Sequence, residues 1–226
     1  MRHVILLSLF LVAVTSDISS AKMFEIEADT KQYGWQSETE NANMFEIEVD
    51  ANQSSVEGRL GITRAFGDSG TLLYGGINVI NSDDEDYTVG GLSLSVGNKV
   101  LSEMLRLDVG FKGLWGTMKQ QRKEGDVMAA AFLLSFIYDI PGVEVFYDVP
   151  LDFELSGNVC IAPDSLSFGD ADNYTEYRIS LGLNILGDKI GTLLVGYRGI
   201  KAEFGEDRKK WDLSDNAVFG GLKFRF

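Results

Sequence analysis

The sequence predicts an all-β protein, a transmembrane antiparallel up-and-down β-barrel of about ten strands, with eight or twelve strands as alternatives. Three observations lead to this fold class. Apolar and polar residues alternate with a period of two along most of the chain, as strands with one apolar face do. Beyond the N-terminus, no apolar run reaches the length of a membrane helix. The last strand also ends on an aromatic residue that continues its alternation.

Residues 1–21 have the layout of a secretory signal peptide. Arg2 precedes an apolar run from Val4 to Val14, and the small residues Ser19 and Ala21 precede a plausible cleavage site. An apolar run of about 11 residues is too short to cross a bilayer as a helix, which takes about 20. A buried N-terminal helix is the less favoured alternative. We therefore expect the mature chain to begin directly after this segment.

A short segment then occurs twice, as MFEIEAD at 23–29 and as MFEIEVD at 44–50. Counting both copies as strands gives an odd number, whereas single-chain bacterial barrels have even numbers. We assign the second copy to the barrel wall because it leads directly into the next strand. Residues 22–43 then form an N-terminal segment with the first copy, and residues 44–226 form the barrel. The alternatives are that the first copy is the wall strand, or that the strands divide into twelve.

The remaining elements are strands of the length that a tilted crossing of a bilayer requires. The alternation is clearest in 105–115, 151–161 and 174–186. In the last of these, Leu181 lies on the apolar face and Arg178 on the polar face. The other predicted strands are 44–50, 55–66, 71–80, 86–97, 126–138, 190–204 and 216–226.

The connections between these strands alternate in character. The short or modest connections are Gly67–Gly70, Gly97–Glu103, Asp139–Pro150 and Gly187–Lys189. The strongly polar connections are 81–86, 119–126, 163–173 and 205–216. Short turns at one end and longer polar loops at the other are typical of outer-membrane barrels. With about ten strands, both termini lie at the short-turn, periplasmic end.

Charges of both signs lie in the middle of the polar faces, which favours a barrel with its apolar face outward over a soluble sandwich or a lipocalin-like barrel. In a narrow lumen such charges can pair across the interior. The candidate lumen-lining residues are Arg106, Asp108, Lys112, Asp152, Glu154, Glu176, Arg178, Lys223 and Arg225. Aromatic residues near predicted strand ends suggest membrane-interface girdles. These are Trp115, Tyr138, Tyr174, Phe204, Phe224 and Phe226.

The last strand has a particular task in such a barrel. Leu222 and Phe224 lie on one face, and Lys223 and Arg225 lie on the other. We expect this strand to pair with the first one, because an open edge in lipid would leave backbone groups without hydrogen-bond partners. Phe226 would then lie at the periplasmic interface.

Several blocks resemble the YfaZ-like family of outer-membrane β-barrel proteins. They are APDSLSFGDADNYTEYRISLGLNI (162–185), VGYRGIKAEF (195–204), VFGGLKFRF (218–226) and GGLSLSVG (90–97), together with the signal peptide. The resemblance implies a porin-like protein of the outer membrane. Phe226 resembles the C-terminal signal that the barrel-assembly machinery of Gram-negative bacteria reads. The implied partners are that machinery, outer-membrane lipid and lipopolysaccharide.

The composition argues against several functions. A formal net charge of −14 disfavours nucleic acid as a partner. Cys160 is the single cysteine, so no internal disulfide is expected and the residue is read as filling space in a strand. The one histidine, His3, lies in the signal peptide, which removes histidine-dependent catalytic and metal sites. Asp152 and Glu154 could act as a carboxylate pair, but the lumen-charge interpretation is preferred. We predict no enzyme activity, no metal and no cofactor.

The sequence therefore predicts a porin-like outer-membrane barrel with a narrow, polar, charge-filled lumen. Because wide aqueous channels need larger barrels, it would pass small solutes or ions at most. The alternative function is a non-transporting structural or surface-interaction barrel that acts through acidic extracellular loops. A soluble periplasmic carrier of the lipocalin type is less favoured.

Overall fold

The computed structural model describes residues 43–66, 70–100, 104–120, 123–146, 149–186, 189–205 and 210–226. Within 141–151 only the backbone is described. The predicted signal peptide and the first MFEIE copy lie outside the described residues.

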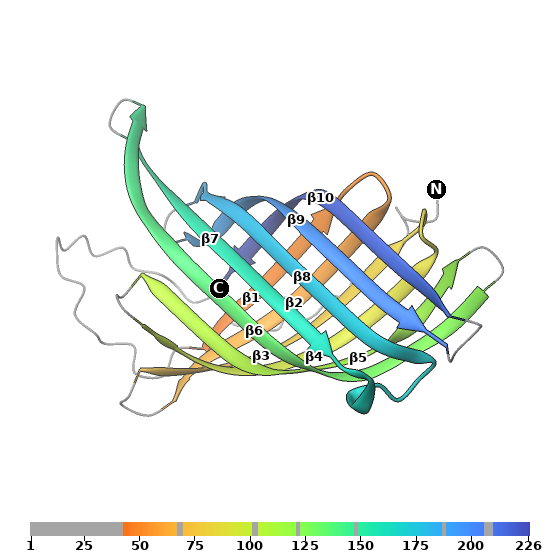
Figure 1. The fold of residues 1–226 in the computed structure, drawn as a ribbon. Coiled ribbons are helices and arrows are strands. Elements are labelled where there is room, and N and C mark those ends of the chain that lie inside the picture. Colours follow the sequence, from red (N-terminus) through yellow and green to blue (C-terminus); the bar gives the residue numbers. More distant parts are fainter. Residues whose placement is uncertain are drawn as a thin grey trace, which may run out of the picture. The chain divides into compact units, whose positions relative to one another are not determined.

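Ten antiparallel strands form one closed barrel in which each strand pairs with its neighbours in sequence and β1 pairs with β10 (Figure 1). The predicted fold class and strand number are confirmed. The strands are β1 (Asn43–Ala51), β2 (Ser55–Phe66), β3 (Thr71–Ser82), β4 (Tyr87–Lys99), β5 (Leu105–Gln120), β6 (Lys123–Phe146), β7 (Val149–Ala162), β8 (Ala171–Asn184), β9 (Gly191–Phe204) and β10 (Trp211–Arg225). A single turn of 3-10 helix, η1 (Asp164–Leu166), follows β7.

No helix among the described residues is long and apolar enough to cross a bilayer.

The second MFEIE copy forms the wall strand β1, where Val49 lies opposite Leu222 of β10. The seam closes at its end through two backbone hydrogen bonds, because Phe45 and Phe226 each donate an N–H to the other's carbonyl at 2.9 Å. The last strand therefore pairs with the first, as a barrel in lipid requires. The end of the barrel that holds Phe226 is called the terminal end below. The opposite end, with the turns at 52–54 and 83–86, is called the distal end.

Two connections differ from the prediction. The predicted connection Asp139–Pro150 is mostly strand, because β6 and β7 continue to pair up to Phe146 and Val149. Register shifts after Ile140 and after Glu144 absorb the irregularity of this segment. The resulting hairpin extends beyond the neighbouring strands (Figure 1). The predicted polar connection 205–216 likewise contains the start of β10.

The apolar face points outward. Leu181 is 41 % exposed and Arg178 on the opposite face is 6 % exposed. This arrangement inverts that of a soluble barrel, in which apolar side chains fill the interior. The outward orientation of the apolar face, which the sequence predicted, is therefore confirmed.

The polarity of both faces reverses near the distal end. On β10, Val218 and Leu222 point outward and Lys223 points inward. Further towards the distal end, the exposed residue is Ser214 and the buried one is Leu213. The outward side chains in the terminal and middle parts of the strand are thus apolar, as contact with lipid requires, and those in its distal part are polar.

β9 shows the same reversal, from exposed Val195 with buried Arg198 to exposed Lys201 with buried Phe204. The distal parts of β9 and β10 therefore extend beyond the band of exposed apolar side chains, which is called the apolar belt below. The start of β10 looks like a loop in sequence because its outward side chains, such as Asp212 and Ser214, are polar.

The aromatic girdle was predicted partly wrongly. Trp115, Tyr138 and Phe226 are exposed on the outside. Tyr174 and Phe204 are instead fully buried inside the barrel. Side chains two residues apart on a strand lie on the same face. Tyr174 lies two residues before the inward-facing Glu176 and therefore also points inward.

Candidate functional site: the barrel lumen

Apolar side chains from strands β3 to β10 fill much of the distal lumen. They form one cluster: Ile80, Tyr87, Val89, Leu114, Met118, Val127, Ala129, Ala131, Cys160, Ala162, Ala171, Tyr174, Ile200, Ala202, Phe204 and Leu213. At its edge the rings of Phe204 and Trp211 stack with centroids 4.1 Å apart. Cys160 is fully buried in this cluster. The lumen is thus polar only in part, which the sequence prediction of a charge-filled lumen did not include.

The middle of the lumen holds a network of buried ion pairs. Glu57 of β2 accepts hydrogen bonds from Arg59 Nε at 2.9 Å, Asn78 Nδ2 at 3.0 Å and Arg198 Nη1 at 3.0 Å. Arg198 also donates to the hydroxyl of Ser55 at 2.6 Å. Such charge-assisted bonds are what a carboxylate needs to stay ionised away from water.

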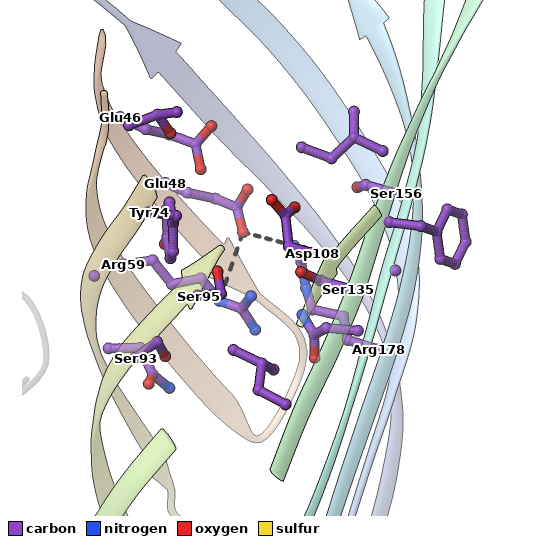
Figure 2. A pocket seen from close by; sticks show the side chains of 18 of the residues that line it. Glu46, Glu48, Arg59, Tyr74, Ser93, Ser95, Asp108, Ser135, Ser156 and Arg178 are labelled. Carbon is purple, nitrogen blue, oxygen red and sulfur yellow. Dashed lines mark ion pairs between the residues drawn. The ribbon is translucent and has the colours of Figure 1, made fainter. Parts of the chain in front are cut away.

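Arg178 of β8 reaches across the interior to β1. Its Nη2 lies 2.7 Å from Glu48 Oε1 and 2.7 Å from Asp50 Oδ2. Its guanidinium carbon also lies 4.5 Å from the centre of the Phe219 ring, in cation–π geometry. Figure 2 shows Arg59 and Arg178 on opposite sides of the interior with Glu48 above them, and Glu48 Oε1 is 3.6 Å from Arg59 Nε. Two arginines from different walls thus share one carboxylate.

A second cluster lies nearer the terminal end. Glu154 of β7 accepts from Lys223 Nζ at 2.5 Å and from Arg225 Nη2 at 2.9 Å. Arg225 also donates from Nε to Glu46 at 3.1 Å. Because β10 is the closing strand, these contacts tie the seam to β7 across the interior.

A third pair joins the charges to the apolar cluster. Lys112 Nζ of β5 donates to both oxygens of Glu176, at 2.9 and 2.7 Å. The hydroxyl of Tyr174 donates to Glu176 at 3.1 Å. The aromatic ring of Tyr174 thereby packs in the apolar cluster while its polar end meets the carboxylate.

The remaining candidate residues lie towards the terminal end. Arg106 pairs with Asp108 at 2.7 Å. Asp152 is exposed, and in the described part of the chain no ion pair involves it. The structure therefore brings eight of the nine candidate charges into ion pairs (Arg106, Asp108, Lys112, Glu154, Glu176, Arg178, Lys223 and Arg225) and leaves Asp152 apart.

The sequence reasoning missed the charges of β1 and β2. Glu46, Glu48 and Asp50 recur at every second position of MFEIEVD, so the signal was present. In β2, glycines at 58 and 61 interrupt the pattern that would have marked Glu57 and Arg59.

A cavity of about 130 Å³ lies among these side chains (Figure 2). The side chain of Glu46 is 21 % exposed and that of Arg59 is 17 % exposed, whereas that of Glu48 is 4 % exposed. Hydroxyl groups also line the cavity: Thr63, Tyr74, Ser93, Ser95, Ser135 and Ser156.

The family model described as "YfaZ precursor" matches residues 35–226. The chain belongs to the YfaZ family. The family predicted from the sequence is therefore confirmed. The closed barrel is separate support for the predicted fold. No curated protein sequence matches this YfaZ-family chain.

Two solved structures that match this chain are described as an outer membrane channel and a porin. One is the outer membrane channel DcaP of Acinetobacter baumannii, with a TM-score of 0.39 and 12 % identity, covering 80 % of this chain and 62 % of that one. The other is the NanC porin, with a TM-score of 0.37 and 12 % identity, covering 81 % of this chain and 99 % of that one. This YfaZ-family barrel therefore spans less than two thirds of the length of the DcaP chain.

Proposed function

We propose that this YfaZ-family chain is a porin-like barrel of the outer membrane that passes ions or small solutes at most. The observation that carries the proposal is the filling of the lumen. Ion pairs occupy its middle and apolar side chains occupy much of its distal part. A ten-stranded barrel filled in this way has no room for the wide aqueous channel of larger porins.

The location proposed is the outer membrane of a Gram-negative bacterium. The outward apolar side chains, such as Val218, Leu222 and Phe224 on β10, support contact with hydrocarbon. Phe226 would serve as the signal for the barrel-assembly machinery. Lipid and, at the distal end, lipopolysaccharide would be the surroundings.

We also propose that the barrel is not an enzyme. Among the described residues, no group of three or more His, Cys, Asp and Glu side chains could hold a metal ion. The buried carboxylates Glu57, Glu154 and Glu176 each accept hydrogen bonds from a cation of the lumen, which favours a structural role for them over general acid–base work.

The test is conductance in planar bilayers. Wild-type barrel should give a small or rarely open current, and the double variant Phe204→Ala with Leu213→Ala should give a larger one, because it thins the apolar cluster. The matched control is Val218→Ala with Leu222→Ala, which removes apolar atoms from the lipid face and should leave the current unchanged. A large, steady wild-type current, or silence in both wild type and core variant, would overturn the passage proposal.

A second candidate is a non-transporting barrel that acts through its distal surface. The exposed acidic turn 83–86 and the acidic residues Asp164 and Asp170 favour it. This function predicts no flux in any variant and a loss of surface integrity or partner binding when turn 83–86 is shortened. Normal surface properties after that deletion would count against it.

A further inference from the structure

One side of the lumen stays polar beside the apolar cluster. Ser55 and Ser82 are buried, inward-facing and directly opposite each other on β2 and β3. Ser82 in turn lies opposite Tyr87 of β4. Polar side chains therefore continue to the distal turns on β2 and β3, beside the apolar cluster that β3 to β10 contribute.

These side chains connect to the terminal end through an unbroken series of contacts. From Arg225 the series runs to Glu154, which also contacts Lys223. Lys223 Nζ lies 3.9 Å from Glu48, which lies 3.6 Å from Arg59.

The series then passes from Arg59 to Glu57 at 2.9 Å, from Glu57 to Arg198 at 3.0 Å and from Arg198 to Ser55 at 2.6 Å. Each step joins two buried or half-buried polar groups. The result is a continuous series of polar contacts from the terminal end to Ser55, contributed by β1, β2, β7, β9 and β10, and it is called the polar track below.

A hydrogen bond lies at the distal end of the polar track. The Tyr87 hydroxyl donates to Asp215 Oδ2 at 2.6 Å, joining β4 to β10 across the interior. Tyr87 is buried and Asp215 is partly exposed. Tyr87 also follows the acidic turn 83–86 directly. The phenol therefore lies beside Ser82 and Ser55 at the distal end of the lumen, and its hydrogen bond to Asp215 spans the interior there.

Along the polar track itself, the carboxylates balance the cationic groups: Glu48, Glu57, Glu154 and Asp215 stand against Arg59, Arg198, Lys223 and Arg225. The preference for cations comes from the acidic turn 83–86 beside the distal end. Charges of one sign around an opening concentrate counter-ions there.

We propose that water and small inorganic cations move along the polar track and that the Tyr87–Asp215 hydrogen bond closes its distal end. This inference rests on the passage function proposed above. It adds the path through the lumen, the class of ion and the residues that close the path. The apolar cluster then excludes larger solutes while the opposite side carries the ions.

Cysteine reactivity tests the route without any current. In a Cys160→Ala background, Ser55→Cys and Ala171→Cys place a thiol at the first residue of a strand at the distal end, and the native residues are 4 % and 3 % exposed. The probe is a methanethiosulfonate reagent with an ammonium group. The Ser55→Cys thiol should react and the Ala171→Cys thiol, inside the apolar cluster, should not. Equal reactivity of the two thiols would overturn the route.

Removing one hydroxyl tests the gate. Tyr87→Phe should speed the reaction of the Ser55→Cys thiol about tenfold, since a hydrogen bond to a charged group is lost. Tyr74→Phe is the matched control because Tyr74 also lines the lumen but lies towards the terminal end. A sulfonate reagent of similar size should react more slowly than the ammonium reagent. No effect of Tyr87→Phe beyond that of Tyr74→Phe, or a faster sulfonate reagent, would refute the gate or the ion class.

The two proposals fail differently. If the barrel carries no current but its Ser55→Cys thiol reacts, ion passage is refuted and the polar track is still accessible to water. If the barrel carries current but its Ser55→Cys thiol does not react, ion passage is supported and this route is refuted. Heat-modifiable gel migration checks that each variant is folded.

Discussion

Arg178 offers the sharpest test of the charge network. Its Nη2 lies 2.7 Å from both Glu48 and Asp50, and all three side chains are buried. Arg178→Ala would leave two buried carboxylates without their closest cation. Breaking one buried pair costs about 3–5 kcal/mol, and the lost cation–π contact with Phe219 adds about 0.5–1 kcal/mol. We expect the free energy of unfolding to fall by about 4–6 kcal/mol.

The measurement is urea unfolding of the barrel in lipid vesicles, followed by tryptophan fluorescence and heat-modifiable migration. Arg64→Ala is the matched control, because Arg64 is an exposed arginine of β2, and it should change the free energy of unfolding by less than about 1 kcal/mol. The triple variant Arg178→Met, Glu48→Gln, Asp50→Asn should recover most of the loss, since it removes the unpaired charges. If Arg178→Ala is as mild as Arg64→Ala, the buried network does not stabilise the barrel as argued.

Three further predictions follow from the fold. Val195→Arg, which puts a charge on the lipid face of β9, should lower the free energy of unfolding by about 2–4 kcal/mol, whereas Ser214→Arg on the water-exposed part of β10 should be nearly neutral; equal costs in urea titrations would contradict the position of the apolar belt. Phe204→Ala should cost about 3–5 kcal/mol by leaving a cavity beside Trp211, and a loss below about 1 kcal/mol would contradict tight distal packing. Deleting Phe226 should reduce the amount of folded barrel in the outer-membrane fraction without affecting export, and an unchanged amount would argue against its role in assembly.

The fold was predictable because the alternation has a period of two over whole strands. In β8, every second residue from Tyr177 to Leu183 is apolar, and Arg178 and Ser180 fall between them. Both the strand and its outward face could therefore be predicted directly. The number of strands followed from the turn residues. The β6–β7 hairpin was missed because Pro141 and Gly142 look like a loop in sequence, whereas the two strands resume pairing after a register shift.

The lumen was predictable only in its parts. Inward-facing charges could be assigned by phase, but their partners could not. Arg178 and Asp50 lie 128 residues apart in sequence and on strands that are not neighbours, so only closure of the barrel brings them together. The apolar distal cluster was missed because, near the distal end, the alternation continues with a period of two but the apolar residues move to the inward face. Tyr174 and Phe204 were assigned to the outside because they lie at strand ends, although their positions in the alternation place them on the inward face.

On β9 and β10 the outer face of the barrel is apolar up to a boundary and polar beyond it. Spin labels at Val218, Leu222 and Ser214 of β10 test this claim most directly, with oxygen as the lipid-soluble relaxation agent and a nickel chelate as the water-soluble one. Labels at Val218 and Leu222 should be relaxed mainly by oxygen, and the label at Ser214 mainly by the nickel chelate. Nickel-accessible labels at Val218 and Leu222 would mean that this face is not in lipid.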